Sequence, residues 1–160
     1  MPGEFVLRVT TSWAPDEAWA RVWDLGRHTA VIPLTRVRLD PPATALGPGV
    51  GFTGRTGVAG VGFDDRMRVV EWSPPTGDGS GRAVVDKVGR VVGGRIEVTV
   101  TPRDGSTAAP ANGAVTRGAL VAWRQSLRLP WLPGPLRWVE VLAAKAVAPG
   151  YHRVLRTLLA

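Results

Sequence analysis

The chain has 160 residues, which is the length of one domain and enough to bury a substantial core. It has no cysteine and two histidines, which excludes disulfides, thiolate metal sites, cysteine nucleophiles and all-histidine metal sites. Hydrophobic residues make up 44% and charged residues 21%, and the formal net charge is +7, so an intrinsically disordered chain is excluded. We therefore expect one domain over residues 1–160, with no metal and no cofactor.

The N-terminal residues Met1–Glu4 have neither the basic nor the apolar region of a secretory signal. No apolar run approaches the roughly 18 residues of a membrane-spanning helix. We therefore expect a cytoplasmic protein without stable membrane insertion.

The first two elements are a strand and an aromatic helix. Residues 4–12 alternate between apolar and polar side chains, which predicts a strand. Pro15 suits the first turn of a helix, and Trp19 and Trp23 then lie on one face of it. Gly26 is expected to end this helix, and the residues after it to add at most one further turn.

A run of strands follows, each bounded by glycine- or proline-rich turns. Gly93-Gly94 is expected to form a two-residue hairpin turn. Residues 49–54 match the G-x-G-x-x-G spacing, but a loop precedes them and strand-like residues follow, so a bent strand is favoured over a dinucleotide site. The predicted strands cover 35–40, 49–57, 62–72, 82–92, 94–102 and 118–129.

A long helix is predicted from about residue 136 to the C-terminus. Pro149 removes the hydrogen bond to the Lys145 carbonyl, so a kink or break is expected over 146–150. The predicted apolar stripe of this helix is Val139, Leu142, Ala143, Ala146, Val147, Val154, Leu155 and Leu158.

This order of elements predicts an α+β fold, in which consecutive strands form a curved antiparallel sheet around the last helix. The many small residues of that helix fill little volume. The hypothesis is that a cavity remains between the sheet and the helix.

Four segments carry a family resemblance: APDEAWARVWDL (14–25), GVGFTGRTG (49–57), GFDDRMRVVEW (62–72) and LVAWRQSLRLP (120–130). With the final helix, they resemble the START/Bet v 1-like (SRPBCC) superfamily, and most closely its actinobacterial polyketide cyclase/dehydrase-type members. The resemblance implies a helix-grip fold of about seven strands around the C-terminal helix, with a cavity for lipophilic ligands. It does not choose among lipid carriers, hormone receptors and aromatase/cyclases.

Two polar residues are predicted on inward, apolar strand faces: Asp65 and Gln125. Both are candidates to orient a ligand. A buried carboxylate needs a partner or a raised pKa, so Asp65 otherwise acts as a general base, caps a turn at a strand end, or pairs with Arg66 or another arginine. Tyr151, beside the proline, is a further ligand contact or else a core residue. His28 is a proton shuttle at the cavity mouth or, the favoured interpretation, a cation at a helix end. The candidate apolar lining is Met67, Val69, Ile96, Val98, Trp123, Leu127 and Val147.

The tryptophans are expected to occupy two kinds of position. Trp19 and Trp23 are expected in the core, whereas Trp13, Trp131 and Trp138 lie near loop or helix ends and are candidates for the cavity rim.

The positive charge is concentrated in the last part of the chain. Residues 1–102 carry a net charge of +1 and residues 103–160 carry +6. The arginines are dispersed, which favours a solvated face over nucleic-acid binding and leaves contact with an anionic membrane surface as a further interpretation.

The sequence therefore predicts a protein, monomer or homodimer, that binds a hydrophobic or amphipathic small molecule, lipid- or polyketide-like, in an internal cavity. The competing interpretation is a polyketide cyclase or dehydratase that uses Asp65 with Tyr151 or His28 as its acid and base.

Overall fold

The computed structural model describes residues 3–76, 79–103 and 118–160. Seven strands form one antiparallel sheet in the order β1-β7-β6-β5-β4-β3-β2, which confirms the predicted α+β class and the strand number. The elements in chain order are β1 (Gly3–Thr11), α1 (Pro15–Val22), α2 (Leu25–Val31), β2 (Thr35–Leu39), β3 (Gly51–Val58), β4 (Val61–Ser73), β5 (Gly81–Val88), β6 (Gly93–Arg103), β7 (Gly118–Leu127), a 3-10 turn (Gly134–Leu136) and α3 (Trp138–Leu158).

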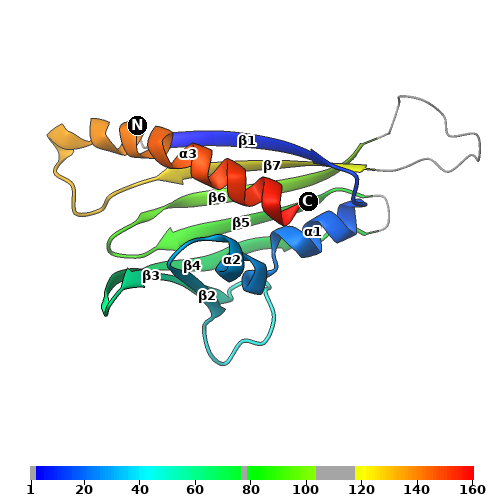
Figure 1. Cartoon of the computed structure of the whole chain (residues 1–160), viewed down its shortest axis with the longest axis horizontal. Coiled ribbons are helices and arrows are strands. Elements are labelled where there is room, and N and C mark those ends of the chain that lie inside the picture. The colour runs from blue at the N-terminus through cyan, green and yellow to red at the C-terminus, as the bar shows by residue number, and fades with distance from the viewer. Residues whose placement is uncertain (1–2, 77–78, 104–117) are drawn as a thin grey trace, which may run out of the picture.

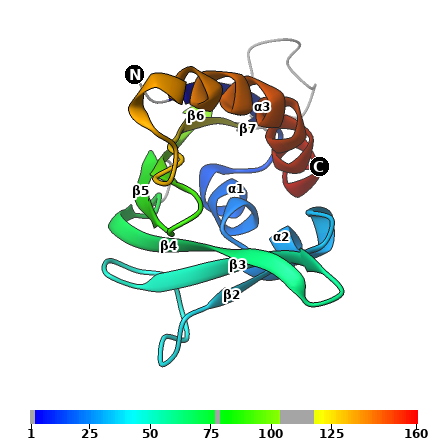
Figure 2. The same ribbon diagram turned by 90° about the vertical axis from the view of Figure 1, so that its left-hand side faces the viewer.

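The sheet curves around the helices. Helix α3 lies along the edge of the sheet formed by β1, and α1 and α2 lie over the inner face (Figures 1 and 2). Helix α3 packs mainly on β1. The two backbones approach so closely that a Cβ atom at Gly3 would collide with the carbonyl oxygen of Glu140. Glycine at this position lets α3 lie directly on the edge strand.

Two short helices replace the single helix expected over the first aromatic segment. Helix α1 ends at Val22, and the Asp24 side chain accepts a hydrogen bond from the Arg27 amide at 3.0 Å, which caps α2. Gly26 lies in the first turn of α2, so the prediction that it ends the helix is wrong. Asp24 caps a new helix that includes Gly26, so the glycine does not end the helix.

The hairpin between β5 and β6 turns earlier than predicted. Strand β6 begins at Gly93, which pairs with Val88, so the turn consists of residues 89–92 and the Gly93-Gly94 prediction is wrong. Gly94 has a φ of +135°, and a Cβ atom there would collide with the carbonyl oxygen of Ser126 on β7. Gly94 thus serves the close packing of β6 on β7 rather than the turn.

Helix α3 runs without interruption through Pro149, so the predicted break is absent. Pro149 and Lys145 are exposed, and water can therefore reach the carbonyl that has lost its intrahelical partner. The predicted apolar stripe is wrong in the first half of the helix. Leu142 is 54% exposed there, while Glu140 and Ala144 are buried against β1.

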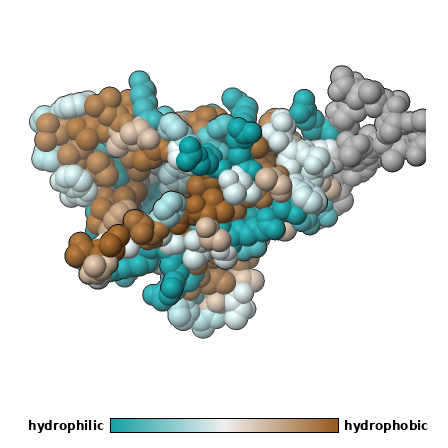
Figure 3. All heavy atoms as spheres, viewed as in Figure 1, coloured by the Kyte–Doolittle hydropathy of each residue, from teal (hydrophilic) through white to brown (hydrophobic). Residues whose placement is uncertain are grey.

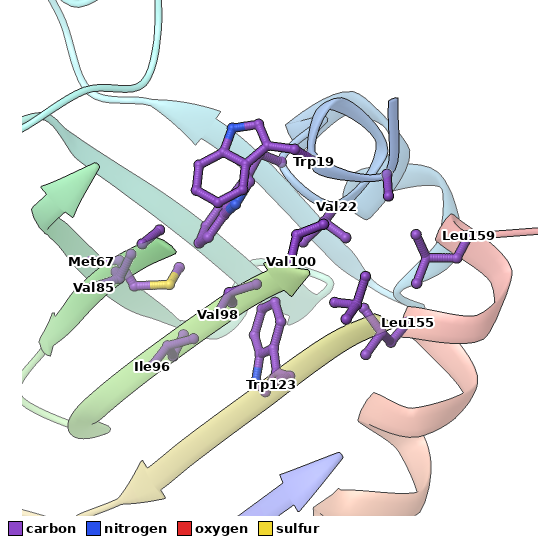
Figure 4. Close-up of a cluster of buried hydrophobic side chains, with 14 of the residues drawn as sticks. Trp19, Val22, Met67, Val85, Ile96, Val98, Val100, Trp123, Leu155 and Leu159 are labelled. Carbon is purple, nitrogen blue, oxygen red and sulfur yellow. The ribbon is translucent and has the colours of Figure 1, made fainter. Parts of the chain in front are cut away.

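Aromatic rings fill the core between α1 and the sheet (Figure 4). Trp72 on β4 packs edge-on against Trp19 at 4.9 Å and Trp23 at 5.1 Å between ring centroids. Trp19 and Trp23 are buried, as predicted. This cluster closes one end of the space between the sheet and α3.

Candidate functional site

A cavity of about 240 Å³ lies between the sheet, α2 and α3. Most of its walls are apolar, and Figure 4 shows Met67, Ile96 and Trp123 projecting from three different strands. The lining side chains include Trp23, Leu25, His28, Ile32, Phe52, Phe63, Asp65, Met67, Lys87, Ile96, Trp123, Gln125, Leu127, Val147, Tyr151 and Leu155.

The structure brings most of the sequence-predicted site residues to this one cavity. Val69 and Val98 are the exceptions, because neither lines it and both lie fully in the hydrophobic core. Each lies two residues beyond a lining residue on its strand, in the part of the sheet under the tryptophan cluster. The residues at the cavity are Asp65, Met67, Ile96, Trp123, Gln125, Leu127, Val147, Tyr151 and His28.

A buried ion pair is the main polar feature of the cavity. Lys87 Nζ on β5 donates to Asp65 Oδ2 on β4, and the two side chains are 2% and 17% exposed. The expected arginine partner of Asp65 is therefore wrong. The second carboxylate oxygen, Oδ1, is buried and has no hydrogen-bond partner among the described residues. One acceptor of a cavity-lining side chain is thus unsatisfied, although its neighbours cover the atom itself.

Sequence reasoning missed Lys87, although the signal was present. Ala83, Val85 and Lys87 alternate on the inward face of β5, and all three are buried. The chain has 18 arginines and only two lysines. A lysine that alternates with apolar residues on the inward face of a strand indicates a buried cation that needs a counter-charge, but it does not identify the partner.

The charge of Lys87 is retained despite its burial. Burial alone lowers the pKa of its ammonium, but nearby Tyr151 and the Asp65 carboxylate outweigh that effect and raise the pKa above its ordinary value of 10.5. The cavity therefore holds a protonated lysine, an aspartate and a phenol close together. Such a set can bind a polar group of a ligand or move a proton to or from it.

Gln125 has a partner inside the protein. Trp123 Nε1 donates to Gln125 Oε1 at 3.1 Å, and Gln125 is 1% exposed. The Trp123 ring lies 6.2 Å from both Trp23 and Tyr151, measured between ring centroids. Gln125 thus fixes the orientation of an aromatic wall of the cavity.

His28 lies in α2, with its ring toward the cavity. Its Nε2 donates to the Val22 carbonyl at 2.7 Å, and burial lowers its pKa below 6.5 despite this bond and nearby Asp24. The imidazole is therefore neutral at pH 7. A neutral ring does not act as the predicted helix-end cation.

The lowered pKa of His28 predicts a loss of stability in mild acid. The unfolded chain binds a proton near pH 6.5 and the folded protein resists it, so the His28 contribution is full above that pH and is lost as the pH falls toward the folded-state pKa. Urea unfolding between about pH 7.5 and 5.5 is expected to show a flatter pH dependence for His28→Asn than for the native protein. His152→Asn is the control for removing a histidine that does not line the cavity. An unchanged slope for His28→Asn would contradict the lowered pKa.

Solved structures share this architecture at low sequence identity. The ZhuI aromatase/cyclase from Streptomyces sp. R1128 matches with a TM-score of 0.61 and 12% identity, over 99% of this chain and 92% of that chain. The allergen Ara h 8.0201 matches with a TM-score of 0.55 and 11% identity, over 99% of both chains. This chain has the START/Bet v 1-like helix-grip fold.

The helix-grip likeness extends to a di-domain aromatase/cyclase, StfQ from the steffimycin biosynthetic pathway, at a TM-score of 0.58 and 15% identity. The match covers 98% of this chain and 49% of that one. No protein-family model and no curated protein sequence matches the chain. Among the described residues of this helix-grip domain, no helix combines the length and apolar content needed to cross a bilayer.

Proposed function

We propose that the protein binds a hydrophobic small molecule with one hydrogen-bond donor, such as a hydroxyl group, in the cavity. The observation that carries the proposal is Asp65 Oδ1, which has no hydrogen-bond partner among the described residues and belongs to a side chain that lines a mostly apolar cavity. Ligand pockets are mostly apolar, with a few placed polar groups that fix orientation. Two structures with the same fold are named as aromatase/cyclases, which supports an organic small molecule as the ligand.

The ligand's apolar body lies against Met67, Ile96 and Trp123, where burial contributes roughly 25 cal/mol per Å². Its hydroxyl donates to Asp65 Oδ1, and Lys87 compensates the charge of the carboxylate. Tyr151 and His28 are the further polar contacts we propose at this wall.

A second candidate is a cyclase or dehydratase acting on a polyketide-like chain. Asp65, Lys87 and Tyr151 in one water-poor cavity favour it, because an aspartate base beside two donors can remove a proton and stabilise the developing oxyanion. Two of the structural neighbours are named as aromatase/cyclases. After incubation of a polyketide-like substrate with the protein, recovery of a product whose mass is lower by one water would favour the enzyme.

The proposal predicts that a bulky residue at the cavity mouth reduces binding. The probe is 2-naphthol, which has two fused aromatic rings and one hydroxyl group. Val147 lines the cavity and is 37% exposed. Val147→Trp is therefore expected to weaken 2-naphthol binding at least about tenfold while leaving the melting temperature nearly unchanged. Val141→Trp is the matched control, because Val141 lies on the same helix, is also 37% exposed and does not line the cavity. Binding is measured by NMR titration.

2-Methoxynaphthalene, which keeps the rings but cannot donate a hydrogen bond, is expected to bind about ten- to a hundredfold more weakly than 2-naphthol, because a hydrogen bond to a charged group contributes about 1.5–3 kcal/mol. Equal affinity for the two probes would remove Asp65 from the proposal. No binding of either probe to the native protein, or equal binding to Val147→Trp, would contradict the cavity as the site.

A further inference from the structure

Exposed apolar side chains gather at the end of the molecule where the β3–β4 hairpin, the β5–β6 turn and the start of α3 lie (Figures 1 and 3). In Figure 3 this end, on the left, is brown both along α3 and at the hairpin. We call the following six residues the apolar rim: Val58, Val61, Val88, Trp131, Trp138 and Leu142, which are 54–80% exposed.

The apolar rim comes from separate segments that the fold brings to one end. Val58 and Val61 form the tip of the β3–β4 hairpin. Trp131 Nε1 donates to the Val91 carbonyl at 3.1 Å, which ties the segment before α3 to the β5–β6 turn. An apolar surface assembled from several segments marks an interaction site more often than scattered exposed residues do.

The rim lies at the mouth of the cavity. Phe63 on β4 and Val147 on α3 both line the cavity and are 37% exposed, so they mark where it meets solvent. Phe63 follows Val61 along β4, and Val147 follows Leu142 along α3. A partner that covers the rim therefore faces the opening.

Cations without partners accompany the rim. Arg90, Arg128, Arg137 and Lys145 are exposed, and none of the four forms a salt bridge with a residue in the described ranges. The surface beside the rim is thus suited to an anionic partner.

We propose that this end of the protein docks on an anionic bilayer surface with the cavity mouth toward the lipid. Trp131 and Trp138 lie at the level of the headgroups, where indole rings combine an apolar body with a hydrogen-bond donor. The unpaired cations contact anionic headgroups. A hydrophobic ligand can then pass between the bilayer and the cavity without crossing water.

A second copy of the chain fits this surface less well. A two-fold symmetric dimer places the same patch on both sides of the interface. The four exposed cations of one copy would then lie near those of the other. Charge therefore favours the bilayer.

The test is co-sedimentation of the ligand-free protein with lipid vesicles at low salt. We expect at least about tenfold tighter binding to vesicles of mixed phosphatidylcholine and phosphatidylglycerol than to phosphatidylcholine alone, and a loss of that difference at high salt. Trp131→Ala/Trp138→Ala is expected to reduce binding to the mixed vesicles at least about tenfold. Val6→Ala/Val70→Ala is the matched control, because these residues are 40% and 50% exposed on other surfaces of the sheet.

Equal binding to both kinds of vesicle, no binding to either, or binding unaffected by the double tryptophan substitution would overturn the proposal. A concentration-dependent dimer that the same substitution abolishes, without vesicle binding, would assign the rim to a second copy instead. The 2-naphthol titration reports the cavity independently, so failure of membrane docking and failure of ligand binding are distinguishable.

Discussion

Lys87→Met is expected to destabilise the folded protein by about 3–5 kcal/mol, because it leaves the Asp65 carboxylate buried without a counter-charge. Lys87 is 2% exposed at its side chain and Asp65 is 17% exposed, so water compensates little of the loss. In a domain of this size, such a change lowers the melting temperature by roughly 10 °C or more. Urea unfolding followed by circular dichroism measures it.

The chain supplies a matched control for this substitution. Lys145, the other lysine, is exposed on α3, and Lys145→Met should change stability by less than about 0.5 kcal/mol. The double substitution Lys87→Met/Asp65→Leu removes both charges and is expected to recover most of the loss. Equal destabilisation by the two lysine substitutions would show that the buried pair does not contribute as described.

The ion pair has a pH signature of its own. Because the folded-state pKa of Lys87 is raised above 10.5, its contribution to stability is complete below that pH and is lost as the pH rises through the folded-state pKa. The stability difference between the native protein and Lys87→Met should therefore persist at pH 9.

Strand alternation was the most informative sequence signal for the site. The period of two residues placed Asp65 and Met67 on the inward face of β4, and Gln125 on that of β7, and the structure confirms these positions. The same period carries Lys87 inward on β5. Its partnership with Asp65 could not be predicted, because it depends on which residues the register of β4 and β5 brings close.

The signals that failed were local ones overruled by tertiary contact. Gly93 and Gly94 have the composition of a hairpin turn, but Gly94 is required where β6 passes Ser126 of β7. Pro149 predicts a broken helix, yet its exposed position leaves the helix continuous. The outcome at Gly94 depends on Ser126, which is distant in sequence, and the outcome at Pro149 depends on exposure to solvent.

The inward face of α3 could not be read from hydrophobicity alone. Glu140 is buried because its Oε1 accepts a hydrogen bond from the Leu129 amide at 2.8 Å, and Ala144 is buried because β1 lies close at Gly3. These contacts turn Leu142 to solvent. The outward turn of this half of α3 places part of the apolar rim beside the cavity.

Trp123→Ala is expected to destabilise the protein by about 3–5 kcal/mol, because the indole is 6% exposed and forms the wall between the cavity and the core. Its removal also leaves Gln125 Oε1 buried without its donor. Trp123→Phe keeps most of the ring volume and is expected to cost less. Trp131→Ala, at a tryptophan that is 62% exposed, should change stability by less than about 0.5 kcal/mol.

Trp123→Ala also separates packing from ligand binding. The variant enlarges the cavity without touching Asp65 or Lys87, so it is expected to bind 2-naphthol more weakly through lost apolar contact while still preferring it to 2-methoxynaphthalene. Circular dichroism during urea unfolding and the NMR titration measure the two effects separately. Loss of the preference for 2-naphthol in this variant would indicate that Trp123 and Gln125, rather than Asp65, select the hydroxyl group.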